Sequence, residues 1–170
     1  MGLLRAIWDK ALPQIWRYGK TFLGLVFRHP LVGATAIARL NDGSEAGAII
    51  LVRRKDDGLW SLPGGLVDWG ETVESTVVRE LQEETGLTVT QIDGLVGVYS
   101  APDRDPRMHS ICIAVAVHVQ GQFAVGDRLE ISGIRAFPVD QVRQFIETSS
   151  LSHDHARQLQ DYFNGSPALR

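Results

Sequence analysis

Residues 65–87 read GLVDWGETVESTVVRELQEETGL and carry six carboxylates in 23 residues. Three of them, Glu80, Glu83 and Glu84, are spaced i, i+3 and i+4, so a helix would place them on one face within about 100° of arc. Like charges this close repel each other and would destabilise an ordinary surface helix. A hard divalent cation such as Mg²⁺ reverses that cost, because it takes carboxylate oxygens as ligands. The spacing therefore predicts a metal site on a helix.

The residues around these glutamates define the expected helix. It should begin at Glu71 or Thr72 and run to about Thr85, because Gly86 is a typical C-terminal stop. Its apolar side is expected to contain Val77, Val78 and Leu81.

The rest of the chain alternates between strand and helix patterns. Residues 60–66 are expected to be irregular because they contain Pro-Gly-Gly, and Ser152 is the expected N-cap of the last helix. The expected strands are Val32–Leu40, Ala48–Arg54, Leu87–Ser100, Ser110–Val119 and Ile134–Val139, and the further helices are Asp140–Glu147 and Ser152–Phe163. Both faces of the strand at 110–119 look covered, which favours an α/β fold with a mixed sheet between helices.

Composition narrows the class of protein. A chain of 170 residues with a net charge of −3 fits one soluble domain and lacks the basic excess of a nucleic-acid surface. Cys112 is the only cysteine, so the sequence excludes an internal disulfide, and its apolar neighbours favour a buried thiol. We found no signal peptide pattern and no apolar run of the roughly 20 residues that a membrane helix needs, so the cytoplasm is the expected compartment.

The first 30 residues differ in charge from the remainder. They carry five basic side chains against Asp9 alone, and residues 3–27 have helical apolar spacing interrupted by Pro13. We therefore expect an amphipathic helical extension over 1–30 and the main domain over 31–170. The helix is expected to pack on the domain or form a homodimer, or alternatively to lie on an anionic membrane surface.

The acidic stretch resembles the Nudix box at every fixed position of that pattern. The matching residues are Gly65, Glu71, Arg79, Glu80, Leu81, Glu83, Glu84, Gly86 and Leu87. Nine constrained positions make the match specific, unlike a single glycine motif. The resemblance implies the Nudix fold and an enzyme that hydrolyses a nucleoside diphosphate linked to another group.

The resemblance also assigns roles to these residues. Glu80, Glu83 and Glu84 would bind Mg²⁺ or Mn²⁺, with the Gly64 carbonyl as a further ligand. Arg79 would orient a helix carboxylate, and Glu71 would pin the preceding loop to the helix. The two glycines at 64 and 65 would let the backbone approach metal and substrate closely.

A second acidic group follows in the chain. Asp127 and Glu130 precede the strand expected at 134–139, where Nudix proteins commonly carry an acidic residue that completes the metal shell or acts as base. Glu130 fits this position better than Asp127 by its spacing to the strand. Glu80 and Glu130 both remain candidates for the general base.

Substrate choice is expected to depend on the loop at 99–109. Pro102 lies where ADP-ribose pyrophosphatases of this family carry a proline. Arg104 and Arg107 could bind phosphate or ribose, because guanidinium groups match phosphate oxygens, or could close the loop by pairing with its aspartates. Tyr99 and Trp69 are candidates for stacking on a base or for packing.

The resemblance favours Mg²⁺-dependent hydrolysis of ADP-ribose to AMP and ribose 5-phosphate. One alternative is a MutT-like nucleoside triphosphate pyrophosphatase that removes unwanted nucleotides. A weaker alternative is a Nudix module that senses a nucleotide without catalysis. In each case the expected partner is a nucleotide-type small molecule rather than a nucleic acid.

Overall fold

A computed structural model describes residues 29–41, 43–105, 108–126, 129–165 and 167–170. The extension expected over 1–30 lies almost wholly outside these residues. Its helix, and the dimer or membrane contact expected of it, remain predictions.

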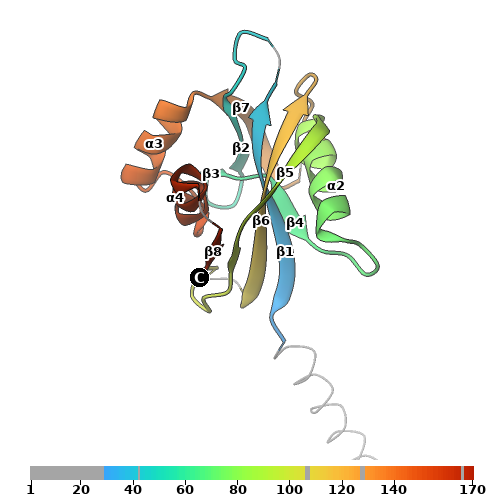
Figure 1. Cartoon of the computed structure of the whole chain (residues 1–170), viewed down its shortest axis with the longest axis vertical. Coiled ribbons are helices and arrows are strands. Elements are labelled where there is room, and N and C mark those ends of the chain that lie inside the picture. The colour runs from blue at the N-terminus through green and yellow to red at the C-terminus, as the bar shows by residue number, and fades with distance from the viewer. Residues whose placement is uncertain (1–28, 42, 106–107, 127–128, 166) are drawn as a thin grey trace, which may run out of the picture. The chain divides into compact units, whose positions relative to one another are not determined.

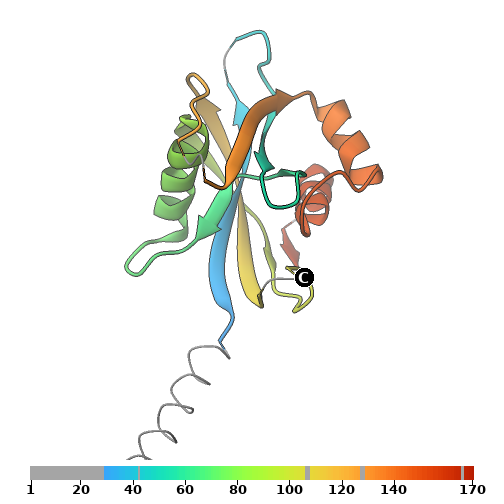
Figure 2. The ribbon, with the colours of Figure 1, turned by 180° about the vertical axis from the view of Figure 1, so that it is seen from behind.

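Within the described residues, eight strands form one mixed sheet with helices on both faces (Figure 1). Figure 2 shows the same layers from behind, with α2 on one side of the sheet and α3 and α4 on the other. The strands are β1 Leu31–Leu40, β2 Ile49–Arg54, β3 Trp60–Ser61, β4 Gly64–Leu66, β5 Thr88–Tyr99, β6 Ser110–Gln120, β7 Ile131–Phe137 and β8 Ala168–Leu169. The helices are α2 Val73–Thr85, α3 Val139–Glu147 and α4 His155–Asn164. The α/β/α sandwich predicted from the sequence is confirmed.

Strand β1 lies at the centre of the sheet and its two edges differ. Along one edge it pairs in parallel with β6 from Leu31↔Ser110 to Leu40↔Val119. Along the other edge it pairs with β4 at one end and with β2 at the other, both antiparallel. The partners β2 and β4 therefore diverge, and this divergence leaves room for a cleft beside β4.

Two separate apolar cores result from the sandwich. The core under α2 includes Val77 and Leu81, which pack against alternate residues of β1, β2 and β6. The core on the other face contains Val142 of α3 and Leu159 of α4, and it includes the buried Cys112. The period-2 alternation of side chains explains why β1, β2 and β6 each contribute to both cores.

The predicted stop of α2 at Gly86 is confirmed, and the helix begins at Val73, next to the expected start at Glu71 or Thr72. Thr72 is the N-cap, and its hydroxyl accepts the Ser75 backbone N–H at 3.1 Å in a reciprocal capping box. Gly86 ends the helix in the left-handed conformation, with φ of 73°. These local signals fix the ends of the helix that carries the three glutamates.

Several sequence expectations are corrected by the structure. Residues 60–66 are not wholly irregular, since β3 and β4 lie within them, and β7 begins three residues earlier than expected. Val78 is exposed rather than apolar-side core. Ser152 does not cap α4, because the helix begins at His155 and the Ser152 hydroxyl instead donates to Asp57 at 2.5 Å. Strand β8, parallel to β5, was not expected.

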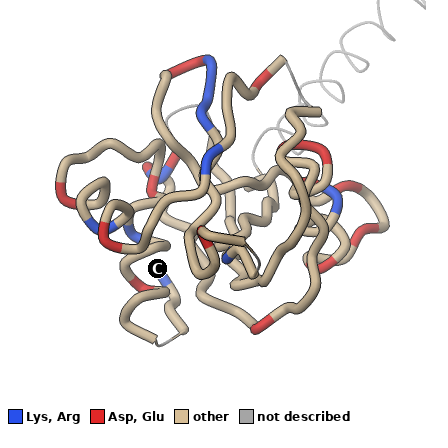
Figure 3. The backbone as a smooth tube through the Cα atoms, turned by 90° about the horizontal axis from the view of Figure 1, so that it is seen from above, with Lys and Arg blue, Asp and Glu red and all other residues tan. Residues whose placement is uncertain are grey.

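Acidic positions are spread over several sides of the described backbone (Figure 3). None of the helices in the described part of the chain has the length and apolarity to cross a bilayer.

Candidate active site

Seven of the expected site residues line a cleft of about 430 Å³ beside β4. Helix α2 forms one wall, and the loop before β6 together with the start of α4 forms the opposite wall. The expected residues that line this cleft are Gly64, Arg79, Glu80, Glu83, Glu84, Arg104 and Glu130. Glu71 contacts these residues from outside the lining.

Arg79 is the organising cation of the α2 wall. Its Nε and one terminal nitrogen donate to both oxygens of Glu71, at 2.8 and 2.9 Å. The other terminal nitrogen donates to Glu80 at 2.7 Å and to Glu83 at 3.2 Å. The Glu71 carboxylate raises the pKa of the Arg79 guanidinium, and Glu80 and Glu83 raise it further. Arg79 therefore orients two of the three helix carboxylates of the box.

Glu71 links the loop before α2 to the helix. Its carboxylate accepts hydrogen bonds from the Asp68 backbone N–H and the Thr76 hydroxyl, at 3.3 and 2.8 Å. The Arg79 guanidinium, aided by these two donors, lowers the pKa of Glu71 to about 2. These contacts match the pinning role that the resemblance implies for Glu71.

Glu84 reaches from the helix to β4. It is only 8% exposed, and its carboxylate accepts the Gly64 backbone N–H at 3.0 Å. Burial raises the pKa of Glu84 to about 8, and the nearby charges of Glu80 and Glu130 raise it further. Burial likewise raises the pKa of Glu80. The cleft thus concentrates carboxylates whose charge the protein only partly compensates.

The two glycines of β4 permit this close approach. A Cβ on Gly64 would lie 2.2 Å from the Ala34 carbonyl oxygen, and a Cβ on Gly65 would lie 2.2 Å from a Glu80 oxygen. No side chain fits at either position without displacing backbone or the carboxylate. This explains why both positions require glycine.

The donor set suits a hard divalent ion. Glu80, Glu83, Glu84 and Glu130 supply carboxylate oxygens to one cleft, which Mg²⁺ and Mn²⁺ prefer as ligands. Across the described residues, however, no three acidic, His or Cys side chains are close enough to surround a single ion. Arg79 and the Gly64 amide hold these carboxylates instead. A bound ion would have to draw the carboxylates together, and the only partly compensated carboxylates of Glu80 and Glu84 fit that change.

Glu130 enters the cleft because of where β7 begins. Strand β7 pairs with β2, so the residue before Ile131 lies beside the end of β2, and the Glu130 carbonyl accepts the Lys55 N–H at 2.9 Å. Its charge acts on Glu84 from this position. Arg54, at the end of β2, lines the same cleft and was not anticipated from the sequence.

The comparisons with known proteins agree with this geometry. A model of the NUDIX domain matches residues 29–162. The chain belongs to the Nudix family. An ADP-ribose pyrophosphatase of Methanocaldococcus jannaschii is 37% identical over 141 residues, which cover 81% of this chain and 75% of that protein. A putative 8-oxo-dGTP diphosphatase of Bacillus subtilis is 33% identical over 123 residues, covering 72% and 76% of the two chains.

Solved Nudix structures share the fold. A MutT NUDIX hydrolase from Burkholderia pseudomallei superposes with a TM-score of 0.62 at 28% identity, covering 78% of this chain and 98% of its own. The NUDIX domain of Shewanella oneidensis NrtR, complexed with ADP ribose, gives 0.68 at 24% identity, covering 82% and 90%. The family membership and the fold class predicted from the sequence are confirmed, and the chain is a Nudix pyrophosphohydrolase.

The far wall of the Nudix cleft is a buried polar network. Arg104 donates to both oxygens of Asp154, at 3.0 and 2.8 Å, and to the Ser110 hydroxyl at 2.6 Å. Asp154 also accepts from Gln158, whose side-chain oxygen accepts the Thr35 hydroxyl at 2.6 Å. All three side-chain nitrogens of Arg104 therefore donate hydrogen bonds. Arg104 lines the cleft as expected, but it ties the loop to α4 rather than presenting a free guanidinium to a phosphate.

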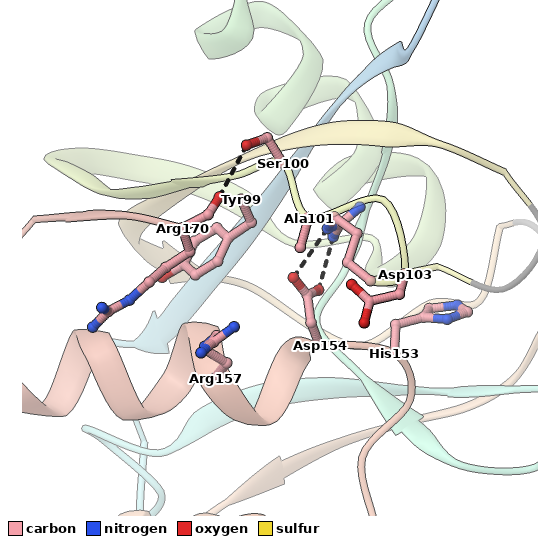
Figure 4. A pocket seen from close by; sticks show the side chains of 9 residues that line it. Tyr99, Ser100, Ala101, Asp103, His153, Asp154, Arg157 and Arg170 are labelled. Carbon is pink, nitrogen blue, oxygen red and sulfur yellow. Dashed lines mark hydrogen bonds and ion pairs between the residues drawn. The ribbon is translucent and has the colours of Figure 1, made fainter.

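Figure 4 shows a second hollow, of about 220 Å³, on the other side of this pair. Two dashed lines end on Asp154 and mark its bonds to Arg104, while Arg157 and Arg170 extend from the C-terminal segment. Arg104 lines both the hollow and the cleft, whereas Asp154 lines only the hollow, so the ion pair forms part of the partition between them.

Tyr99, expected as a stacking candidate, is corrected by its burial. It is 1% exposed and its hydroxyl donates to Asp161 at 3.2 Å, so it offers no ring face to a base. Trp69 is fully exposed and lies outside the cleft lining, so packing is excluded for it. Pro102 is exposed and also lies outside the lining, and Arg107 is outside the described residues. Trp60, near the same cleft, packs edge-on against Phe137.

The least predictable member of the cleft is His155. It comes from the start of α4, about 70 residues after the box, and no motif identifies it. Its neighbours Asp154 and Gln158 in the partition wall were missed for the same reason. A helical i, i+4 relation between Asp154 and Gln158 was the one sequence signal that could have suggested a shared face.

Proposed function

We propose that this Nudix hydrolase cleaves ADP-ribose to AMP and ribose 5-phosphate, with Mg²⁺ or Mn²⁺ bound by Glu80, Glu83 and Glu84. The observation that carries the chemistry is the gathering of these three carboxylates, with Glu130, in one cleft. The substrate is supported by the 37% identity to a relative named ADP-ribose pyrophosphatase. In the reaction, water adds to one phosphorus and the bridging P–O bond breaks.

The chain's own residues have distinct tasks in this proposal. A divalent ion in the cleft would neutralise diphosphate charge and lower the pKa of the attacking water. Glu80, Glu83 and Glu84 would hold that ion, with the Gly64 carbonyl as a further ligand. Arg79 and Glu71 keep the carboxylates oriented. Glu80 and Glu130 are the two candidates to accept the proton of water.

A second candidate function is hydrolysis of nucleoside triphosphates to monophosphates and pyrophosphate. It is favoured by the 33% identity to a putative 8-oxo-dGTP diphosphatase. The metal site and the residues that hold it would be the same, so the two candidates differ only in the group that occupies the rest of the cleft.

A substrate panel separates the candidates. Purified protein would be incubated with Mg²⁺ or Mn²⁺ and ADP-ribose, NADH, diadenosine polyphosphates, dGTP or 8-oxo-dGTP, with products resolved by chromatography. We expect the highest kcat/KM for ADP-ribose, with AMP and ribose 5-phosphate as products. A higher value for the triphosphates would select the second candidate. No turnover of any compound would contradict both and favour a nucleotide sensor.

The metal assignment needs a separate test with a matched control on the same helix. Glu83→Gln removes one proposed ligand, whereas Glu74→Gln changes an exposed glutamate in the first turn, outside the cleft. We expect Glu83→Gln to lower kcat by about 100-fold or more and to weaken Mn²⁺ binding, since a bound ion contributes several kcal/mol. Unchanged Mn²⁺ affinity in Glu83→Gln would refute the assignment.

A further inference from the structure

His155 presents a hydrogen-bond donor to the cleft in a fixed orientation. The residue is 6% exposed, and its Nδ1 accepts the Leu62 backbone N–H at 3.1 Å. A ring nitrogen that accepts a hydrogen bond carries no proton, so the proton of the neutral imidazole is on Nε2. The Leu62 amide therefore selects the tautomer.

The Nε2 atom is not used by the fold. Within the described residues, the Nδ1 bond to Leu62 is the only hydrogen bond of this ring. Nε2 is also not one of the fully buried, unpaired side-chain atoms in that part of the chain. The residue lines the cleft. On a residue that is more than nine-tenths buried and lines the cleft, such a donor is available to an acceptor that enters the cleft.

The surroundings keep the ring neutral. Burial lowers the pKa of His155 to about 3, and the charges of His153, Arg104 and Arg54 lower it further against the opposing effect of Asp154. The imidazole is therefore a donor through Nε2 across the physiological range. Because its tautomer is already fixed, little reorganisation is needed when an acceptor arrives.

The position of His155 relative to the glutamates is set by one short segment. His155 binds the backbone N–H of Leu62, and Glu84 binds that of Gly64. Two residues of extended chain span at most about 7 Å. One substrate molecule can therefore reach both the carboxylates and the imidazole.

We propose that the Nε2–H of His155 donates a hydrogen bond to an oxygen in the phosphate–ribose portion of the substrate, which makes His155 a specificity-determining residue. This inference rests on the proposed function, since it places the diphosphate at Glu80, Glu83 and Glu84. Selection follows because a substrate without an oxygen at this point would leave the buried donor unpaired.

Two variants separate the donor from the structural acceptor. In His155→Asn, the side-chain oxygen is as many bonds from Cα as Nδ1, so it can still accept from Leu62, but nothing replaces the Nε2 donor. In His155→Gln, the amide is as many bonds from Cα as Nε2, so a donor remains while the acceptor for Leu62 is lost. The measurements are kcat and KM for ADP-ribose and the melting temperature of the full chain.

We expect opposite effects from the pair. His155→Asn should raise KM about three- to tenfold, the loss typical of one hydrogen bond, with kcat and melting temperature nearly unchanged. His155→Gln should keep KM within about twofold and lower the melting temperature. If the histidine were purely structural, His155→Asn would leave KM unchanged. That result would overturn the proposal.

Binding measurements keep this test independent of turnover. The affinity of AMP and of ribose 5-phosphate for wild type and His155→Asn would be measured calorimetrically with Mg²⁺. Weaker binding of one of the two identifies the half of the substrate that His155 contacts. If AMP binds wild type and His155→Asn with the same affinity, and ribose 5-phosphate does too, the inference is overturned. Absence of ADP-ribose turnover by the wild type would contradict the proposed function alone.

Discussion

Arg79 bonds three carboxylates at once, and its geometry explains why lysine is a poor substitute. The Nε and terminal nitrogens hold Glu71 in a two-point contact while a third nitrogen reaches Glu80 and Glu83. A lysine ammonium lacks this planar fork. We expect Arg79→Lys to lower kcat by about 10- to 100-fold, the usual effect of losing a residue that orients metal ligands.

Steady-state kinetics on the best substrate of the panel would check this effect. Arg157→Lys is the control, because Arg157 is exposed and lies outside the cleft lining. An Arg79→Lys protein with wild-type kcat would mean that the guanidinium is not needed to orient the glutamates.

At the residue scale, the sequence identified what the helix period and the box determine, but not the contacts that depend on distant packing. Glu80, Glu83 and Glu84 share a cleft because i, i+3 and i+4 positions share a helix face. By contrast, the partner of Arg104 is Asp154, 50 residues away, and only the packing of the loop against α4 brings them together. For Tyr99 stacking and packing both stayed open, because an aromatic at a strand end can face either the core or the cleft, and local pattern does not decide which.

At the scale of single elements, β4 depends on two glycines for different reasons. The missing Cβ of Gly64 faces the backbone of β1, whereas that of Gly65 faces the Glu80 carboxylate. We expect Gly64→Ala to lower the melting temperature, because backbone must move. Gly65→Ala should mainly lower kcat, because a flexible side chain is displaced.

Thermal denaturation and kinetics of both variants would separate the two effects. Gly133→Ala is the control, since a Cβ there would meet only the Arg53 Cβ at 4.0 Å. Equal losses of melting temperature in Gly64→Ala and Gly65→Ala would contradict this account of β4. The glycines were predictable from the box, but the strand they form was not, because Pro-Gly-Gly is a typical turn sequence.

The pairing of the loop before β6 with α4 rests on Arg104 and Asp154. Their side chains are 7% and 15% exposed, so removing one charge leaves the other buried without its partner. Asp154→Leu should lower the free energy of unfolding by about 3 kcal/mol. The double variant Arg104→Met/Asp154→Leu should recover part of that loss, because no buried charge remains unpaired.

Urea denaturation of the two single variants and the double variant closes this thermodynamic cycle. A double variant whose loss of stability equals or exceeds the sum of the two single losses would contradict the favourable coupling that the structure indicates. The same cycle measured by KM would show a smaller effect if Arg104 acts mainly on the fold rather than on the substrate.

For the whole molecule, buried His155 makes stability depend on pH. Its pKa is lowered from 6.5 to about 3 in the fold, so the unfolded chain binds more protons below pH 6.5 and stability falls as the pH drops toward 3. Between pH 7 and pH 5 this one group should cost about 2 kcal/mol. Glu84 acts oppositely, since its pKa is raised to about 8 and its contribution is lost as the pH rises.

Comparing wild type with His155→Asn isolates the histidine contribution. Both proteins contain Glu84, so the difference in their urea-denaturation free energies at pH 7 and pH 5 reports His155 alone. We expect the wild type to lose about 2 kcal/mol more than the variant over this interval. Parallel pH profiles would contradict a neutral, buried imidazole.

The parallel pairing of β1 with β6 also sets the order in which the chain can fold. Leu31 pairs with Ser110, so β1 is synthesised 79 residues before its main partner. At about 5–20 residues per second, it waits roughly 4–16 s on the ribosome. Its middle, Ala34–Ala38, is fully buried in the finished sheet. Until β6 emerges, β1 can pair with β2 and β4 and be covered by α2, but its parallel edge stays open, so a nascent chain stalled before residue 110 exposes that edge.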